Sequence, residues 1–207
     1  MKVLVLSPHT DDAELACGAT ISRLIREGHE IHYVAFSACE RTLKDKGLPT
    51  GMLITESDEA TEALGISKEN TEILDFDVRY FPENRQAILD SLIRINKEIK
   101  PDLILSPCIH DVHQDHFTVA SEVLRAFKRK TILMYEEPWN NFSFSNQMFI
   151  KLEEEDVKTK IKALSCYKSQ GDKDYMTEEY TRGVLRMHGV QIGEQYAEVF
   201  ETPRIVI

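Results

Sequence analysis

The feature that most constrains the fold is a repeated alternation of short apolar runs with amphipathic segments. Residues 3–6 form a β-branched apolar run typical of a strand buried on both faces, and residues 12–27 follow with helical spacing that stops at Gly28. Further strands are predicted over 31–36, 71–74, 102–106 and 131–135, with helices over 53–64, 84–99 and 115–127. This α/β order predicts a Rossmann-like open, mostly parallel sheet of strand order 3-2-1-4-5 with helices on both faces.

The pattern changes after Pro138. There we predict a loop over 140–147, helical segments over 153–167 and 178–187, and a late strand over 196–200; an earlier loop is predicted over 37–51. The 207 residues suit one domain, so we expect a single domain over residues 1–207.

Composition excludes several classes of protein. A formal net charge of -10 argues against a nucleic-acid partner and against a polybasic membrane anchor. The first apolar run is too short for a signal peptide, and no stretch approaches the ~20 apolar residues of a spanning helix. The four cysteines, Cys17, Cys39, Cys108 and Cys166, lie far apart, as reduced thiols would. We therefore expect a cytoplasmic protein.

The loop after the first predicted strand reads His9-Thr10-Asp11-Asp12-Ala13-Glu14. A dinucleotide site would need a glycine-rich turn here, but Gly18 lies well inside the predicted helix. A histidine and an aspartate instead suit half of a catalytic zinc site, with the second aspartate facing a metal-bound water. The competing interpretation is that Asp11 or Asp12 only caps the helix.

A second cluster, His110-Asp111-Val112-His113-Gln114-Asp115-His116, follows the predicted strand 102–106. It holds three of the seven histidines, although a solvated loop is an alternative. In a strand order of 3-2-1-4-5, the first and fourth strands are neighbours, and ligands bind outside their carboxyl ends. Convergence of His9, Asp12 and one histidine of this cluster would give three ligands and an open fourth position, as in catalytic zinc sites.

These two motifs resemble those of the LmbE-like, or PIG-L type, N-acetylglucosaminyl deacetylases. The family patterns are His-Pro-Asp-Asp-x-Glu and His-Pro-Asp-His; here both prolines are replaced, by Thr10 and Gln114, while the polar residues are kept. The resemblance extends into residues 135–139, 166–170 and 196–200 and so covers most of the chain.

The resemblance implies a role for each site residue. The implied metal ligands are His9, Asp12 and His116. Asp11 is the implied general base, and His113 would stabilise the oxyanion or donate a proton. Asp115 would orient a histidine. The implied cofactor is Zn²⁺, and Fe²⁺ suits the same ligand set.

The implied activity is zinc-dependent removal of the N-acetyl group from a GlcNAc-type amino sugar or its conjugate, giving a free amine and acetate. Two alternatives are a metal-dependent amidase acting on a non-sugar acylated small molecule and a non-catalytic metal- or sugar-binding module. Family members often form homo-oligomers, trimers or hexamers, and the sequence alone does not choose between these states.

The substrate-binding residues stay unassigned at this point. Where the family often carries an arginine, this chain has Leu53, and Arg41 is a candidate replacement. Trp139, Phe142 and Phe144 would suit either an apolar wall against a sugar ring or packing of a lid or core.

Overall fold

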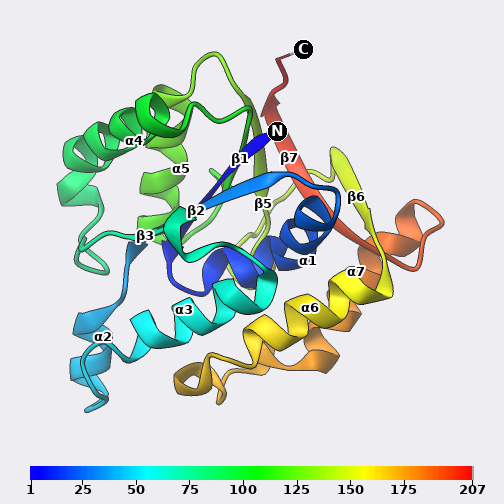
Figure 1. Ribbon diagram of the computed structural model, residues 1–207, viewed down its shortest axis with the longest axis horizontal. Helices are drawn as coiled ribbons and strands as arrows, with labels where there is room; N and C mark the ends of the chain where they lie inside the picture. The colour runs from blue at the N-terminus through cyan, green and yellow to red at the C-terminus, as the bar shows by residue number, and fades with distance from the viewer. Residues whose placement is uncertain (207) are drawn as a thin grey trace.

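A seven-stranded mixed sheet forms the centre of the computed structural model, which describes residues 1–206 (Figure 1). The strand order is β3-β2-β1-β4-β5-β7-β6. The strands are β1 (Lys2–His9), β2 (Glu30–Ser37), β3 (Thr71–Ile73), β4 (Leu103–Pro107), β5 (Thr131–Tyr135), β6 (Met148–Leu152) and β7 (Tyr196–Arg204). The first five are parallel, whereas β7 pairs antiparallel with both β5 and β6. The predicted α/β class and the order 3-2-1-4-5 are confirmed.

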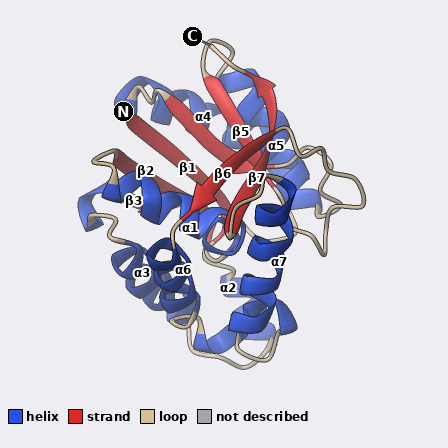
Figure 2. Cartoon of the chain, turned by 90° about the vertical axis from the view of Figure 1, so that its right-hand side faces the viewer, coloured by secondary structure: helices blue, strands red, loops and turns tan. Residues whose placement is uncertain are grey.

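Helices cover both faces of this sheet (Figure 2). They are α1 (Asp12–Arg26), α2 (Glu40–Asp45), α3 (Met52–Leu64), α4 (Arg85–Ile99), α5 (Gln114–Ala126), α6 (Glu154–Leu164) and α7 (Glu178–Gln191). Four short 3-10 turns join them: η1 (Lys68–Asn70), η2 (Pro82–Asn84), η3 (Lys168–Gln170) and η4 (Asp174–Met176).

The first strand shows why its sequence reads as continuously apolar. Val3 and Val5 pack in one core with residues of α1, α3 and α6, and Leu4 and Leu6 pack in a second core with residues of α4 and α5. All four side chains are fully buried. Because successive side chains of a strand point to opposite faces, a strand covered on both faces needs apolar residues at every position.

The structure differs from the sequence expectations in four places. The short helix α2 lies inside the predicted loop 37–51. Strand β6 was not predicted; it is a partly exposed edge strand whose pairing with β7 depends on residues almost fifty positions away. The predicted late strand 196–200 continues to Arg204, and the helix predicted over 153–167 ends at Leu164.

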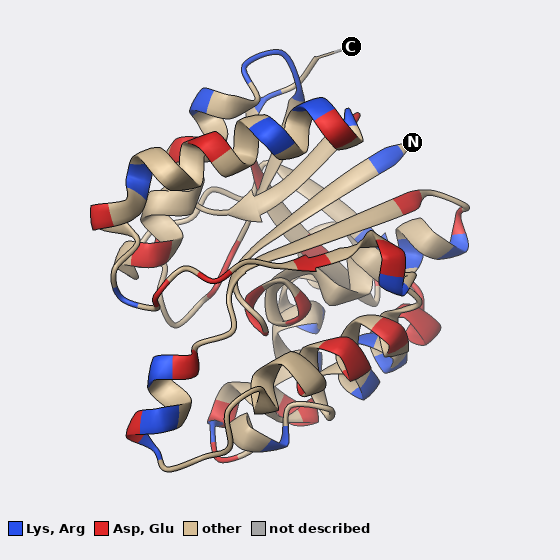
Figure 3. Cartoon of the chain, turned by 60° about the vertical axis from the view of Figure 1, so that its left-hand side comes forward, with Lys and Arg blue, Asp and Glu red and all other residues tan. Residues whose placement is uncertain are grey.

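Charged side chains lie mainly on the outer helices, while the central strands are almost free of them (Figure 3). Acidic and basic residues are interspersed along most of these helices, whereas α3 carries four acidic residues and no lysine or arginine. Within residues 1–206, none of the helices is both long and apolar enough to span a membrane.

Two glycines of α7 provide a matched test of how this helix packs. A Cβ on the buried Gly189 would lie 2.7 Å from the carbonyl oxygen of Gln195 and 2.8 Å from that of Glu194, both backbone atoms. We expect Gly189→Ala to lower the free energy of unfolding by about 1–3 kcal/mol. Gly183 has open space around it, so Gly183→Ala should raise stability by about 0.5–1 kcal/mol. Urea unfolding of both variants checks this, and equal midpoints would contradict it.

Candidate metal centre

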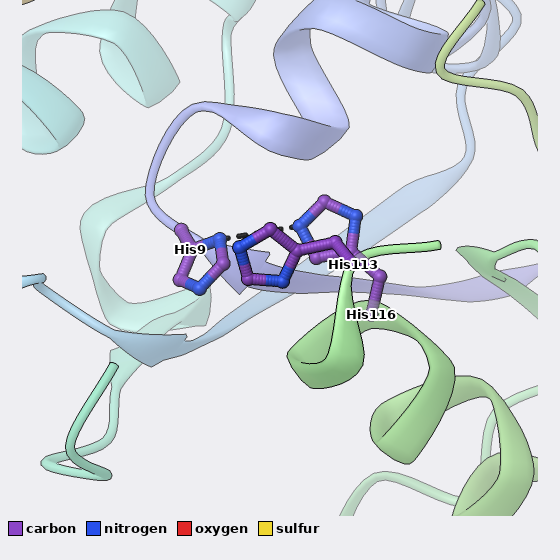
Figure 4. A group of neighbouring side chains, drawn as sticks. All are labelled: His9, His113 and His116. Carbon is purple, nitrogen blue, oxygen red and sulfur yellow. Dashed lines mark hydrogen bonds between the residues drawn. The ribbon is translucent and has the colours of Figure 1, made fainter. Parts of the chain in front are cut away.

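The two histidine-containing motifs meet at the carboxyl ends of β1 and β4. These strands are parallel neighbours, with Val3 opposite Leu103 and Val5 opposite Leu105. His9 is the last residue of β1, and the cluster after β4 leads into α5. Figure 4 shows the rings of His9, His113 and His116 gathered at one place from these two elements.

Three donor atoms form a small triangle at the centre of this cluster. Asp12 Oδ2 lies 3.1 Å from His9 Nδ1 and 3.1 Å from His116 Nε2, and the two nitrogens are 3.2 Å apart. All three side chains are buried. A tetrahedral metal ion with bonds of about 2.0–2.1 Å, as zinc makes to nitrogen, sets its ligand atoms about 3.3 Å apart. The spacing of the triangle therefore fits one metal ion.

Two buried carboxylates fix the orientation of the histidine rings. Asp115 Oδ2 accepts a hydrogen bond from His9 Nε2 at 3.0 Å, and Asp111 Oδ2 accepts one from His116 Nδ1 at 2.8 Å. These bonds leave the lone pairs of the other two ring nitrogens directed at the carboxylate of Asp12. Three electron-pair donors that face one another in a buried place repel unless a cation lies between them.

Asp115 is itself held by the backbone of the segment before α4. Its oxygens accept hydrogen bonds from the N–H groups of Arg79, at 2.6 Å, and Phe81, at 3.3 Å. Arg79 has a φ of 73°, a left-handed conformation that costs a residue with a side chain about 1–2 kcal/mol. This conformation places the Arg79 N–H on the carboxylate that orients His9.

Two further side chains could donate to the same ion. His9, His113 and His116 form one group whose ligand atoms lie within 4.8 Å of one another, and Asp12, His116 and Glu137 form a second. Glu137 is buried, and its Oε1 has no hydrogen-bond partner among the described residues. The site therefore offers more donors than the three that a catalytic zinc site uses.

The electrostatics of the triangle favour positive charge. Burial opposes protonation of His9, but Asp12 and Asp115 outweigh it and raise the pKa of His9 to about 9. The pKa of His116 is raised in the same way, against the effect of burial, chiefly by Asp12. Burial works against ionisation of Asp12, yet the two histidines hold its pKa well below the ordinary value. In the metal-free protein, protons on His9 and His116 supply the positive charge that a bound metal ion would otherwise bring.

Asp11 lies beside the triangle and faces the open pocket. It occupies the N-cap position of α1, but its side chain makes no capping hydrogen bond, which is contrary to the interpretation of Asp11 as a helix cap. Burial and then the negative charge of Asp12 raise its pKa, while Lys173 lowers it. Lys173 lines the same pocket.

His113 caps α5, and its ring faces the pocket. Its Nδ1 accepts the backbone N–H of Asp115 at 3.2 Å, so in the neutral ring the proton lies on Nε2. Burial and then repulsion from His116 and His9 lower the pKa of His113 to about 4. At neutral pH the ring is therefore an uncharged hydrogen-bond donor.

The structure brings every predicted site residue to this centre and adds three that the sequence analysis missed. Asp111 lies inside the second motif but had no assigned role. Glu137 follows the carboxyl end of β5, a place where a buried acidic residue is itself a signal of a site. Lys173 comes from the loop between η3 and η4, where no sequence pattern marked it.

Only some of the residues predicted to contact the substrate line the pocket over the triangle. An open hollow of about 340 Å³ lies over the triangle, and Leu53 and Trp139 line it. Arg41 instead pairs with Asp77 at 2.5 Å and is not part of this lining. Phe142 is 89% exposed and Phe144 packs against the core, so the aromatic wall predicted from these residues contains only Trp139.

The chain is similar in sequence to known deacetylases. The PIG-L family model, described as GlcNAc-PI de-N-acetylase, matches residues 4–127, more than half of the chain. The uncharacterized deacetylase YaiS of Escherichia coli is 30% identical over 174 residues, which cover 81% of this chain and 90% of YaiS. The diacetylchitobiose deacetylase of Thermococcus kodakarensis is 25% identical over 219 residues, or 95% and 81% of the two chains.

A solved structure extends the likeness of fold to almost the whole chain. The zinc-inhibited form of teicoplanin deacetylase Orf2 superposes with a TM-score of 0.79 at 17% identity, covering 98% of this chain and 97% of Orf2. At this identity the likeness shows the fold alone.

The buried carboxyl group of Glu14 stabilises the loop that carries Asp11. Glu14 is fully buried and contacts the hydroxyls of Tyr167, at 2.7 Å, and Tyr33, at 2.9 Å. Both hydroxyls also reach the carbonyl oxygen of Thr10. Burial raises the pKa of Glu14 from 4.5 to about 8, so the group is protonated at neutral pH.

This pKa predicts how stability depends on pH. Between pH 4.5 and 8 the folded chain holds a proton on Glu14 that the unfolded chain has lost, so stability falls as pH rises, by up to about 1.4 kcal/mol per unit. Glu14→Gln fixes the neutral form and should remove this slope. Urea unfolding of chelator-treated wild type and variant at pH 5, 6.5 and 8 measures it. Parallel pH curves for the two proteins would show that Glu14 is ionised in the fold.

Proposed function

The chain belongs to the PIG-L, or LmbE-like, family of de-N-acetylases, and we propose that it is a zinc-dependent N-deacetylase of a GlcNAc-type amino sugar or its conjugate. Membership makes the chain a deacetylase, a hydrolase of carbon–nitrogen bonds. The proposed products are a free amine and acetate.

One observation carries the proposal: the triangle of His9, Asp12 and His116 opens onto a pocket in which a spare carboxylate, Asp11, lies beside it. Two nitrogens and one oxygen at this spacing suit zinc, and an open fourth position is typical of catalytic rather than structural zinc. A site that only bound metal or sugar would have no use for the second aspartate. The zinc-inhibited form of Orf2 shows that a protein of this fold can bind zinc, and it does not show that zinc serves turnover.

When bound, zinc supplies a Lewis acid for the amide carbonyl and lowers the pKa of water towards about 7. Asp11 is proposed to take the proton of the attacking water and to return it to the nitrogen as the carbon–nitrogen bond breaks. In the metal-free chain burial and Asp12 raise the pKa of Asp11, and a metal ion bound at Asp12 would keep this carboxylate ionised and able to accept a proton. Such proton transfer commonly contributes about 10²–10⁴-fold in rate.

His113 is proposed to stabilise the oxyanion by a hydrogen bond. Its low pKa and its accepted bond from the Asp115 N–H favour a neutral ring that donates from Nε2. Of the two roles that the family resemblance leaves open, these properties support hydrogen bonding over delivery of a proton. Removal of one such donor commonly costs about 10²–10³-fold in turnover.

The substrate class is supported by the relatives. The Thermococcus protein is a diacetylchitobiose deacetylase, and the matched family is described by a GlcNAc-bearing substrate. Acetate release from N-acetylglucosamine, N,N'-diacetylchitobiose and an N-acetyl amino acid tests the proposal. Turnover of the amino acid alone would favour the non-sugar amidase, and zinc binding without any turnover would favour a binding module.

Two substitutions should separate chemistry from metal binding. We expect Asp11→Asn to keep one zinc per chain and to lose about 10²–10⁴-fold in turnover, because the base is removed while the ligands remain. His116→Ala should lose the zinc, since it removes one corner of the triangle. Metal analysis and acetate release measure both. The control is His29→Ala, which lies away from the site and should keep zinc and activity.

Two results would contradict these assignments. Turnover of Asp11→Asn at the wild-type rate would exclude Asp11 as the base. Full zinc occupancy in His116→Ala would mean that other donors, such as His113 or Glu137, complete the metal site.

Zinc binding should also release protons. At pH 7 the metal-free protein holds a proton on His9, whose pKa is about 9, and zinc can bind only the deprotonated nitrogen. We expect the release of about one to two protons per zinc at pH 7 and an affinity that rises roughly tenfold per pH unit for each proton displaced. Calorimetry in two buffers of different ionisation enthalpy counts these protons. A binding enthalpy that is the same in both buffers would contradict protonated histidines.

A further inference from the structure

Helix α1 is broken near its start, and a glutamate from the last strand caps the break. Cys17 has non-helical angles, with φ -136° and ψ 22°. In an unbroken helix the N–H groups of Ala19 and Thr20 would bond to the carbonyl groups four residues before them. Here they donate instead to the carboxylate of Glu198 on β7, at 3.2 Å to Oε1 and at 2.6 Å to Oε2. Glu198 therefore acts as the N-cap of the second part of α1.

A buried lysine holds this carboxylate in place. Lys160 of α6 has its Nζ 2.7 Å from Glu198 Oε1, and both side chains are buried. Lys160 passes close to α1 to reach Glu198, because a Cβ on Gly18 would lie only 3.2 Å from Lys160 Cγ. The two backbone N–H groups and the ammonium together compensate a carboxylate that would otherwise be costly to bury.

The two parts of α1 are tied to different strands. In the first part, Asp12 Oδ2 accepts the backbone N–H of His9 at 2.8 Å, and the N–H of Ala13 donates to Ser7 Oγ at 3.0 Å. Ser7 and His9 belong to β1, whereas Glu198 belongs to β7. The break therefore lets the turn with the two aspartates follow β1 while the rest of the helix follows β7 and α6.

We propose that Glu198 is a positioning residue that keeps the break in α1 open and so places Asp11 and Asp12 at the metal centre. The inference rests on the proposed function, because that function gives the two aspartates their roles in binding metal and moving a proton. Glu198 is not part of the lining of the pocket over the triangle. It acts through the backbone of α1 and not on the substrate.

The alternative partners of the two capped N–H groups give the physical reason for this role. Ala19 and Thr20 are fully buried, and a buried N–H that loses its partner must find another. The carbonyl groups four residues back are the partners that an unbroken helix uses. Bonding to them would straighten α1 and turn Asp12 away from the two histidine ligands. A misplacement of about 1 Å in such a site can cost about a hundredfold in rate.

The experiment compares two double variants that differ in one hydrogen-bond acceptor. Both carry Lys160→Met, so that no unpaired lysine is buried when the carboxylate is removed. In the acceptor-keeping variant, Glu198→Gln retains a carbonyl oxygen for the capped N–H groups; in the acceptor-free variant, Glu198→Met has a similar size and retains none. The control is Arg26→Met, which removes another contact between α1 and α6, the ion pair with Asp156.

Three measurements are made on the full chain. The first is kcat and KM for the acetamide that the zinc-loaded wild type hydrolyses best. The second is zinc affinity, by competition with a chelator. The third is a crystal structure of each double variant, which reports the backbone angles of Cys17. The second and third do not depend on turnover.

We expect the acceptor-free variant to lose about ten- to a hundredfold in kcat and about tenfold in zinc affinity. Its KM should stay within about threefold, because the change lies outside the pocket. Cys17 should take helical angles, with φ about -60° and ψ about -45°. The acceptor-keeping variant should stay within about threefold of wild type in kcat and zinc affinity, and Arg26→Met should match wild type in both.

If the acceptor-free variant does not fold, Glu198→Asp replaces it, because the shorter side chain draws the carboxylate back from both N–H groups while keeping its charge. We expect it to lose about three- to tenfold in kcat with KM unchanged.

Three outcomes would overturn the proposal. Equal kcat and zinc affinity in the two double variants would mean that Glu198 only stabilises the fold. An equal loss of kcat in Arg26→Met would mean that any loosening of α1 against α6 has this effect. A rise in KM at constant kcat would place the effect in the pocket. If the wild type hydrolyses no acetamide, the proposed function fails, and zinc affinity with the Cys17 angles still decides whether Glu198 positions Asp12.

Discussion

The mutual repulsion of three buried electron-pair donors is the constraint on which the rest of this site depends. His9, Asp12 and His116 direct their lone pairs at one point because Asp115 and Asp111 occupy the outer nitrogens of the two rings. Such an arrangement is stable only around a positive charge. The raised pKa values of the histidines and a fit to a tetrahedral ion are two expressions of that one requirement.

The same requirement explains how neighbouring groups differ in charge. His113 stacks on His116, with ring centroids 4.5 Å apart, and its burial and the adjacent positive charge keep it neutral. Glu137 is buried and Asp11 is partly buried beside Asp12, and both have raised pKa values. Neighbouring carboxyl groups of one site therefore differ in proton affinity, and their environment alone makes the difference.

Much of this could be predicted from the sequence. The alternation of apolar runs and helical segments predicted the parallel core and its strand order, and that order placed the two motifs at adjacent strand ends. The edge strand β6 could not be predicted because it is short and partly exposed, and because its pairing with β7 depends on residues distant in the sequence. The sequence also did not indicate a role for Asp111, Glu137 or Lys173. The role of each depends on which ring or cavity its side chain faces, and spacing along the chain does not encode that.

The left-handed backbone at Arg79 has a consequence for how such a site can vary. The main-chain amide of this residue steadies the carboxylate behind His9, while its side chain lines the pocket. The main chain of Arg79 therefore supports the metal site, and its side chain shapes the pocket entrance. Substitution of this side chain, by glycine or asparagine with least strain, would reshape the entrance and leave the main-chain hydrogen bond to Asp115 in place.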